Sequence, residues 1–367
     1  MQIPISARVD VQKLATVFGE VTNSYKFYWL LSILDSLQER QEARMSMQDL
    51  SLRMLAQVWY PLDFFKLSFG KQDSFKSVAA RISTFIQVDN RPSAPNLYVQ
   101  LRAQLSPQEV AQLLGTTRRL LDWVPYRFIR PFFALETRAL PDQQVNARVT
   151  QLTNASVRAP YRIDGEFIVL HENWRDYLQE HQLILRAYAK WHIVKFLQKH
   201  NPHVIGLSQK LEKPRPEQRK LATAKRFWQS YLESTVSLPC IYSGQDVTLE
   251  NMSLDHFLPW SYVVHDLLWN IIPIPKSVNS AKSDWLPARA YFSGFARTQY
   301  EAFSFHVDRP AHHRLLEDYS LLFAKQFQDI HSLSFDQFKE QLASQIMPQL
   351  QTAQNMGFAY PYSFAKK

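Results

Sequence analysis

Five polar residues whose types and order could support catalysis lie within one short stretch of the chain, between residues 254 and 287. They are a carboxylate, an imidazole, two amides and an ammonium group, at Asp255, His256, Asn270, Asn279 and Lys282. A neutral histidine can take a proton from water near neutral pH, because its unperturbed pKa is about 6.5. We therefore expect the chemistry of this protein to lie in this stretch.

The sequence around these residues predicts two strands. Pro259 ends a first strand that carries Asp255 and His256. Adjacent side chains in a strand point to opposite faces, so a shared role for these two requires the strand to end or bend there. The apolar run 271–275 indicates a second strand, with Asn270 at its start.

The segment after the second strand favours a short helix. Its residues, KSVNSAKSD, are small or polar, with Ser277 as the expected N-cap and a proline at position 287 as the limit. The predicted order is strand, long loop, strand and short helix, and these elements carry Asp-His, Asn, Asn and Lys-Ser-Asp in that order. This arrangement resembles the ββα-metal motif of the HNH endonucleases. The resemblance is closest to the Asp-His variant in the HNH domain of RNA-guided CRISPR effectors, and the whole chain resembles bacterial HNH-domain endonucleases of unknown role.

This resemblance implies an endonuclease that hydrolyses phosphodiester bonds of DNA with the help of one divalent ion. His256 would be the general base that activates water, and Asp255 and Asn279 would hold the ion. Because both ligands offer oxygen, Mg²⁺ or Mn²⁺ is favoured over Zn²⁺. Asn270 would orient the His256 ring or brace the loop, and Lys282 would lie near a phosphate. Phage defence or a mobile element is a typical setting for such a protein, and protein or guide-RNA partners stay open.

The same residues also have a plainer interpretation. Asp255 could pair locally, His256 could be a satisfied polar core residue, and the asparagines could belong to turns. The corresponding alternative function is a catalytically silent nucleic-acid-binding or scaffold subunit with an HNH-like fold. His265 and Asp266 form a second histidine–aspartate pair, which we interpret as loop or cap residues.

The composition describes a basic, folded chain of 367 residues. Lys and Arg number 42 against 33 Asp and Glu, and the net charge of +9 indicates a polyanionic partner. A hydrophobic content of 46% excludes disorder. The single cysteine, Cys240, excludes an intrachain disulfide and favours the reducing cytoplasm. No apolar run approaches a membrane span and the N-terminus has no signal pattern, so we expect a soluble protein.

The pattern of helical and strand signals predicts an α+β fold, a mainly helical protein with a ββα-metal nuclease module. We expect a helical N-terminal domain at 1–207, the HNH nuclease domain at 208–300 and a C-terminal helical segment at 301–367. The N-terminal domain should contain a small β-hairpin at 161–170, because the Asp-Gly pair within YRIDGEFIVL suits a tight turn.

Basic residues outside the motif give three further candidates for contact with nucleic acid. Lys26 lies beside aromatic residues in TNSYKFYW, which we interpret as a buried helix rather than a binding surface. Arg127 and Arg130 lie among aromatic residues, where cation–π packing and phosphate contact are both open. The segment 208–226 precedes the motif, and we expect backbone contacts there, with a solvated linker as the alternative, from Lys213, Arg215, Arg219 and Lys220.

Overall fold

The computed structural model describes most of the chain, in six ranges: residues 2–19, 21–71, 73–88, 91–115, 118–215 and 219–364. It confirms a mainly helical α+β fold, in which every sheet is small and antiparallel. No helix in these ranges is both long enough and apolar enough to cross a membrane.

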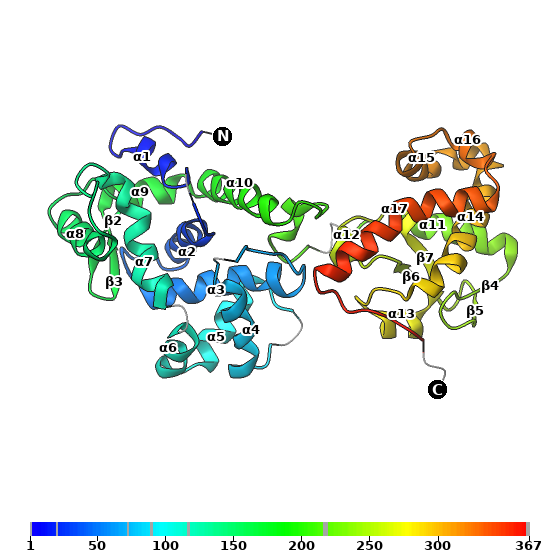
Figure 1. The fold of residues 1–367 in the computed structure, drawn as a ribbon, viewed down its shortest axis with the longest axis horizontal. Helices are drawn as coiled ribbons and strands as arrows, with labels where there is room; N and C mark the ends of the chain where they lie inside the picture. Colours follow the sequence, from blue (N-terminus) through cyan, green and yellow to red (C-terminus); the bar gives the residue numbers. More distant parts are fainter. Residues whose placement is uncertain are drawn as a thin grey trace. The chain divides into compact units, whose positions relative to one another are not determined.

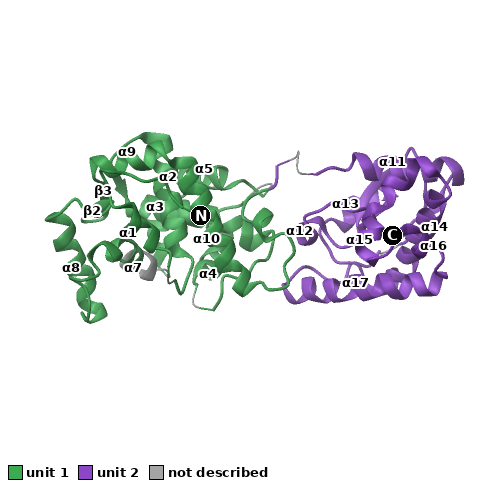
Figure 2. Ribbon diagram, turned by 90° about the horizontal axis from the view of Figure 1, so that it is seen from above, with its two compact units in different colours: residues 1–213 green, residues 214–367 purple. Residues whose placement is uncertain are grey.

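The chain divides into two compact units, Met1–Lys213 and Pro214–Lys367 (Figure 2). The first boundary falls near the expected one at 207. The second unit takes in residues 214–300 of the expected nuclease domain together with residues 301–367, because helices from both parts share one hydrophobic core. In particular, α14 (Phe292–Val307) packs against α17 (Phe335–Asn355) and also against the second strand of the ββα motif.

Unit 1 is built on two long helices, α2 (Tyr25–Arg40) and α3 (Met47–Asp63), which pack on each other (Figure 1). The aromatic residues Tyr25, Tyr28 and Trp29 of α2 are buried, which confirms that TNSYKFYW forms a buried helix. The other helices of the unit are α1 (Val11–Thr16), α4 (Phe75–Phe85), α5 (Ala94–Gln104), α6 (Pro107–Gly115), α7 (Arg118–Ile129), α8 (Asp142–Asn154), α9 (Glu172–Glu180) and α10 (Gln182–His200).

A small antiparallel sheet in unit 1 contains the predicted hairpin. Strands β2 (Tyr161–Asp164) and β3 (Phe167–Leu170) pair in register from Tyr161 opposite Leu170 to Asp164 opposite Phe167, and β1 (Arg44–Ser46) pairs with the other edge of β3. Gly165 in the turn has a φ of +58°, a left-handed conformation that glycine adopts without steric cost. The hairpin prediction is therefore confirmed.

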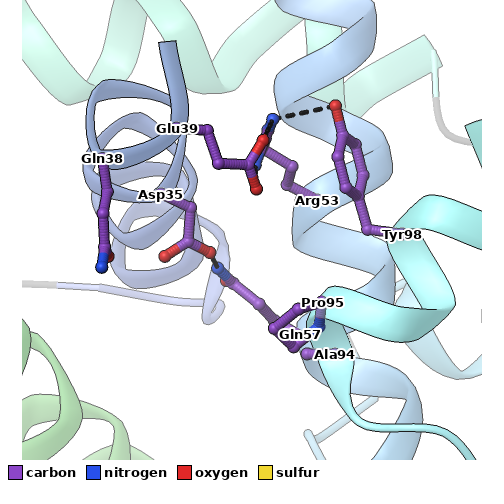
Figure 3. A pocket seen from close by; sticks show the side chains of 8 residues that line it. All are labelled: Asp35, Gln38, Glu39, Arg53, Gln57, Ala94, Pro95 and Tyr98. Carbon is purple, nitrogen blue, oxygen red and sulfur yellow. Dashed lines mark hydrogen bonds and ion pairs between the residues drawn. The ribbon is translucent and has the colours of Figure 1, made fainter. Parts of the chain in front are cut away.

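The guanidinium group of Arg53 joins three helices of unit 1. It donates two hydrogen bonds to the Glu39 carboxylate on α2, at 2.9 and 2.6 Å, and one to the Tyr98 hydroxyl on α5, at 2.9 Å. These groups line a pocket of about 370 Å³ in which the amide of Gln57 also donates to Asp35 (Figure 3). The ionic contacts balance the buried charge of Arg53 and hold α2, α3 and α5 together.

Unit 2 surrounds the predicted motif with helices (Figure 1). Before the motif come α11 (Ala222–Thr235) and the two-stranded sheet of β4 (Leu238–Pro239) and β5 (Asp246–Val247). The motif itself is β6 (Met252–His256), β7 (Ile271–Pro275) and α13 (Lys276–Lys282), with the short helix α12 (Trp260–Val263) and the 3₁₀ segment η4 (Leu268–Asn270) between the strands. After it come α14, η6 (Pro310–Leu316), α15 (Glu317–Phe323), α16 (Phe327–His331) and α17.

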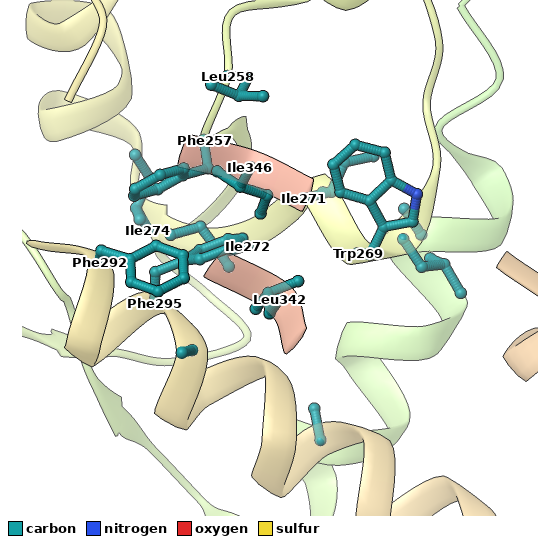
Figure 4. Close-up of a cluster of buried hydrophobic side chains, with 14 of the residues drawn as sticks. Phe257, Leu258, Trp269, Ile271, Ile272, Ile274, Phe292, Phe295, Leu342 and Ile346 are labelled. Carbon is teal, nitrogen blue, oxygen red and sulfur yellow. The ribbon is translucent and has the colours of Figure 1, made fainter. Parts of the chain in front are cut away.

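The core of unit 2 lies around the buried strand β7 (Figure 4). Every residue of β7 is buried, and Phe257 stacks on Phe295 of α14 with ring centroids 4.1 Å apart. The indole of Trp228 on α11 donates to the carbonyl of Ile271 at 3.1 Å. These contacts fix the β6–β7 sheet between α11 and α14, so the end of β6 has a rigid support.

Candidate active site

The strands and helix of the candidate site follow the order expected from the sequence. Strands β6 and β7 pair antiparallel with Asp255 opposite Ile272 and His256 opposite Ile271. Helix α13 follows β7 directly, and its N-cap is Pro275 rather than the expected Ser277. Pro275 is extended, with φ −61° and ψ 143°, so the helix begins on the residue that follows it.

The carboxylate of Asp255 is buried and has a partner on each oxygen. Its Oδ1 accepts a hydrogen bond from Lys282 Nζ at 2.9 Å, and its Oδ2 accepts one from the Tyr242 hydroxyl at 3.1 Å. Burial raises the pKa of Asp255 above its ordinary value, and the Lys282 ammonium opposes that rise. Asp255 is thus held in one position by the side chains of Lys282 and Tyr242, which both lie outside β6.

Lys282 forms an ion pair inside unit 2. Its side chain is fully buried, and the ammonium donates to the Asp255 carboxylate and, at 2.8 Å, to the backbone carbonyl of His256. The ammonium therefore forms an internal ion pair, and the expected contact with a phosphate stays a prediction. Helix α13 ends at Lys282 and is followed by Ser283, which has a positive φ of 48°, and the buried Asp255 carboxylate compensates the charge of the ammonium.

His256 is paired with Asp266, a residue that the sequence did not connect with it. His256 Nε2 lies 2.9 Å from Asp266 Oδ1, and both side chains are buried, at 5% and 6% exposed. The other oxygen, Oδ2, accepts the backbone N–H of Lys220 at 2.6 Å. Burial alone would raise the pKa of Asp266, but the hydrogen bonds from His256 and Lys220 outweigh it and leave the pKa below its ordinary value.

Asn270 braces the loop between the strands. Its side-chain oxygen accepts the Leu258 N–H at 2.8 Å, and its amide donates to the Leu258 carbonyl at 2.9 Å. In addition, the Asn270 carbonyl accepts the N–H of Phe257. Of the two roles expected for Asn270, these contacts fit the brace, and they fix the backbone directly after His256.

Asn279 on α13 lies against the residues of β6 that precede Asp255. Its amide nitrogen donates to Ser253 Oγ at 2.7 Å and to the Leu254 carbonyl at 3.2 Å. Asp255 and Asn279 offer a carboxylate and an amide oxygen, which are the donor types that hard divalent ions prefer. Within the described ranges no group of three or more His, Cys, Asp or Glu gathers that could hold a metal ion.

The basic residues expected to contact nucleic acid are divided between the units. Lys213 is the last residue of unit 1, and Arg215 belongs to unit 2. Both residues take part in interactions within the chain. Arg219 lies over the Trp260 ring, 5.5 Å from its centroid. Lys220 contacts the site through its backbone N–H, which reaches Asp266. The segment before α11 is therefore connected to the candidate base.

The comparisons with known proteins agree with the geometry. Residues 240–288 match the family model of the HNH endonucleases. Neither the curated proteins nor the solved structures gave a match. The matched residues begin just before the β4–β5 turn and include both strands and the helix of the motif. The chain therefore contains a domain of the HNH endonuclease family.

Proposed function

We propose that this protein is an endonuclease that hydrolyses phosphodiester bonds of DNA, with His256 as the general base. The observation that carries the proposal is the pairing of His256 with the buried Asp266. His256 lies on β6, the strand that also carries Asp255. A histidine held by a carboxylate on one ring nitrogen is oriented for proton transfer at the other.

The pairing defines how a proton would move. Asp266 has a lowered pKa, so it is ionised at neutral pH and accepts a hydrogen bond from the Nε2–H of His256. The neutral ring then has its lone pair on Nδ1, which takes the proton of the attacking water. Asp266 stabilises the imidazolium that results. The Leu258 backbone, braced by Asn270, keeps the loop after His256 in place during this step.

The neighbouring residues suit the binding of a divalent ion. Asp255 and Asn279 would hold Mg²⁺ or Mn²⁺, which would polarise the scissile phosphate and stabilise charge on the leaving oxygen. Lys282 favours the ionised form of the Asp255 carboxylate despite its burial, and the Ser253 hydroxyl fixes the amide of Asn279. The net charge of +9 and the basic residues Lys213, Arg215, Arg219 and Lys220 supply the attraction to a nucleic-acid backbone.

One observation favours a second candidate function. Both oxygens of Asp255 already have partners, Lys282 and Tyr242, as expected in a domain that keeps the HNH shape without turnover. The second candidate is therefore a catalytically silent nucleic-acid-binding or scaffold subunit.

Incubation of the purified chain with supercoiled plasmid and Mg²⁺ or Mn²⁺ separates the two. A site with one general base cuts one strand per binding event, so the endonuclease should produce nicked circles before linear DNA. Excess chelator should stop the reaction. If the chain binds DNA but leaves both DNA and RNA intact with either ion, the silent subunit is the correct function.

A further inference from the structure

Unit 1 contains a cavity of about 780 Å³ that the HNH domain does not explain. It lies among the start of α2, the loop before α4 and the helix α7, and positively charged side chains reach it from all three: Lys26, Lys71 and Arg127. Among the described residues that line it, the single acidic one is Asp142. The cavity therefore has a net positive wall.

The positive charges in this wall are poorly compensated. Arg127 donates to Asp142 at 2.8 Å, but that carboxylate is 71% exposed, and water weakens the attraction. Lys26 Nζ has a backbone carbonyl, that of Val17, at 3.3 Å. Its pKa is lowered by burial and then by the nearby Arg127 and Arg130. Cations placed this close repel one another, and a bound anion would remove that cost.

The cavity also offers an aromatic surface. The Arg127 guanidinium lies over the ring of Trp123, 4.7 Å from its centroid, and Trp123 itself lines the cavity and is partly exposed. A ring beside several cations is the combination by which proteins bind the bases and phosphates of nucleic acid strands. The volume of the cavity far exceeds that of one phosphate ion, so the cavity fits a segment of an anionic polymer rather than a free ion.

We propose that this cavity binds the phosphate backbone of a nucleic acid strand. The choice of nucleic acid as the anion rests on the proposed function, because the chain carries an HNH-family domain and a net charge of +9. The contact itself is separate from the active site: Lys26, Lys71 and Arg127 belong to unit 1. Cation–π packing and phosphate contact by Arg127 are then compatible, since the guanidinium that stacks on Trp123 also faces the cavity.

The test compares two double variants that each remove two positive charges from unit 1. The cavity variant is Lys71→Ala with Arg127→Ala, and the control is Lys195→Ala with Lys199→Ala, two exposed lysines of α10 that do not line the cavity. Both are made in the whole 367-residue chain, which also carries His256→Ala to prevent cutting. Fluorescence anisotropy with labelled duplex and single-stranded DNA gives the dissociation constant at several salt concentrations.

The cavity variant should bind DNA more weakly than the parent. The slope of log K against the logarithm of the salt concentration should become less steep, by about 1.8 for duplex DNA or about 1.4 for single-stranded DNA. The control should keep the slope of the parent. Equal slopes in the cavity and control variants overturn the proposal, and so does a parent that binds no DNA. Lys71→Ala alone, in an exposed loop, should give about half the change and covers the case in which the double variant does not fold.

Cleavage by chains with intact His256 is measured in parallel. If the chain cuts plasmid but the cavity variant binds DNA in the same way as the control variant, the result contradicts this proposal and leaves the proposed function standing. A protein that binds DNA through the cavity and never cuts contradicts the proposed function alone.

Discussion

His256 Nε2 and Asp266 Oδ1 lie 2.9 Å apart, although the two residues are ten positions apart in the chain. Asp266 is also bonded to the backbone of Lys220, so it joins the segment before α11 to the strand that carries the candidate base. In the proposed mechanism Asp266 is therefore a positioning residue, and its effect on catalysis should pass through His256.

Replacing Asp266 with asparagine should lower the rate of DNA cleavage. An amide at this position cannot stabilise the imidazolium and can favour the wrong tautomer of His256, so kcat should fall by roughly 10²- to 10⁴-fold with KM little changed. Asp246→Asn, the same chemical change at an exposed position of β5, is the matched control. Equal single-turnover rates for the two variants would show that Asp266 has no part in the reaction.

Lys282→Met should destabilise unit 2. It removes the ammonium from a buried ion pair and leaves the Asp255 carboxylate without its cationic partner, a loss of about 3–5 kcal/mol. The control is Lys276→Met at the exposed start of the same helix, where the change should stay within about 0.5 kcal/mol. Urea unfolding measures both.

A second variant identifies the cause of that destabilisation. Adding Asp255→Asn to Lys282→Met removes the unpaired charge, so the double variant should recover part of the lost stability. A Lys282→Met protein as stable as the control would mean that the pair contributes nothing.

Metal binding gives an independent check on the two proposed ligands. Calorimetric titration with Mn²⁺ should show one site in the unsubstituted chain, with weaker binding in Asp255→Ala and in Asn279→Ala. Asp246→Ala, which removes a carboxylate outside the site, should bind as the parent does. If Asp255→Ala binds Mn²⁺ with the parent's affinity, the ion is held elsewhere.

Part of the site could be predicted from the sequence because it is encoded locally. Asp255 and His256 end one strand, and Asn279 lies on the helix that follows the next strand, so residue order alone places them together. The Asn270 brace was also among the expected roles. These features depend on short-range signals such as Pro259, which follows β6 and caps α12, and Pro275, which ends β7.

The remainder depends on tertiary contacts that no short-range pattern contains. The position of Asp266 is set by the path of the loop after β6, which Asn270 fixes through Leu258. Lysine side chains are almost always exposed, so the presence of a lysine at position 282 did not indicate that this side chain is buried against β6. The one signal for Asp266 was its place in an HD pair between the two strands, and spacing alone could not assign it a partner.

The central claim is that this protein cuts DNA with His256 as the general base, and His256→Ala tests it most directly. The measurement is the rate at which equal amounts of the unsubstituted chain and the variant nick supercoiled plasmid in Mg²⁺. DNA binding is measured on the same samples. The account predicts a loss of about 10²- to 10⁴-fold in rate with binding nearly unchanged, because the substitution removes the proton acceptor and leaves Asp255 and Asn279 in place. Equal rates for the two proteins would contradict it.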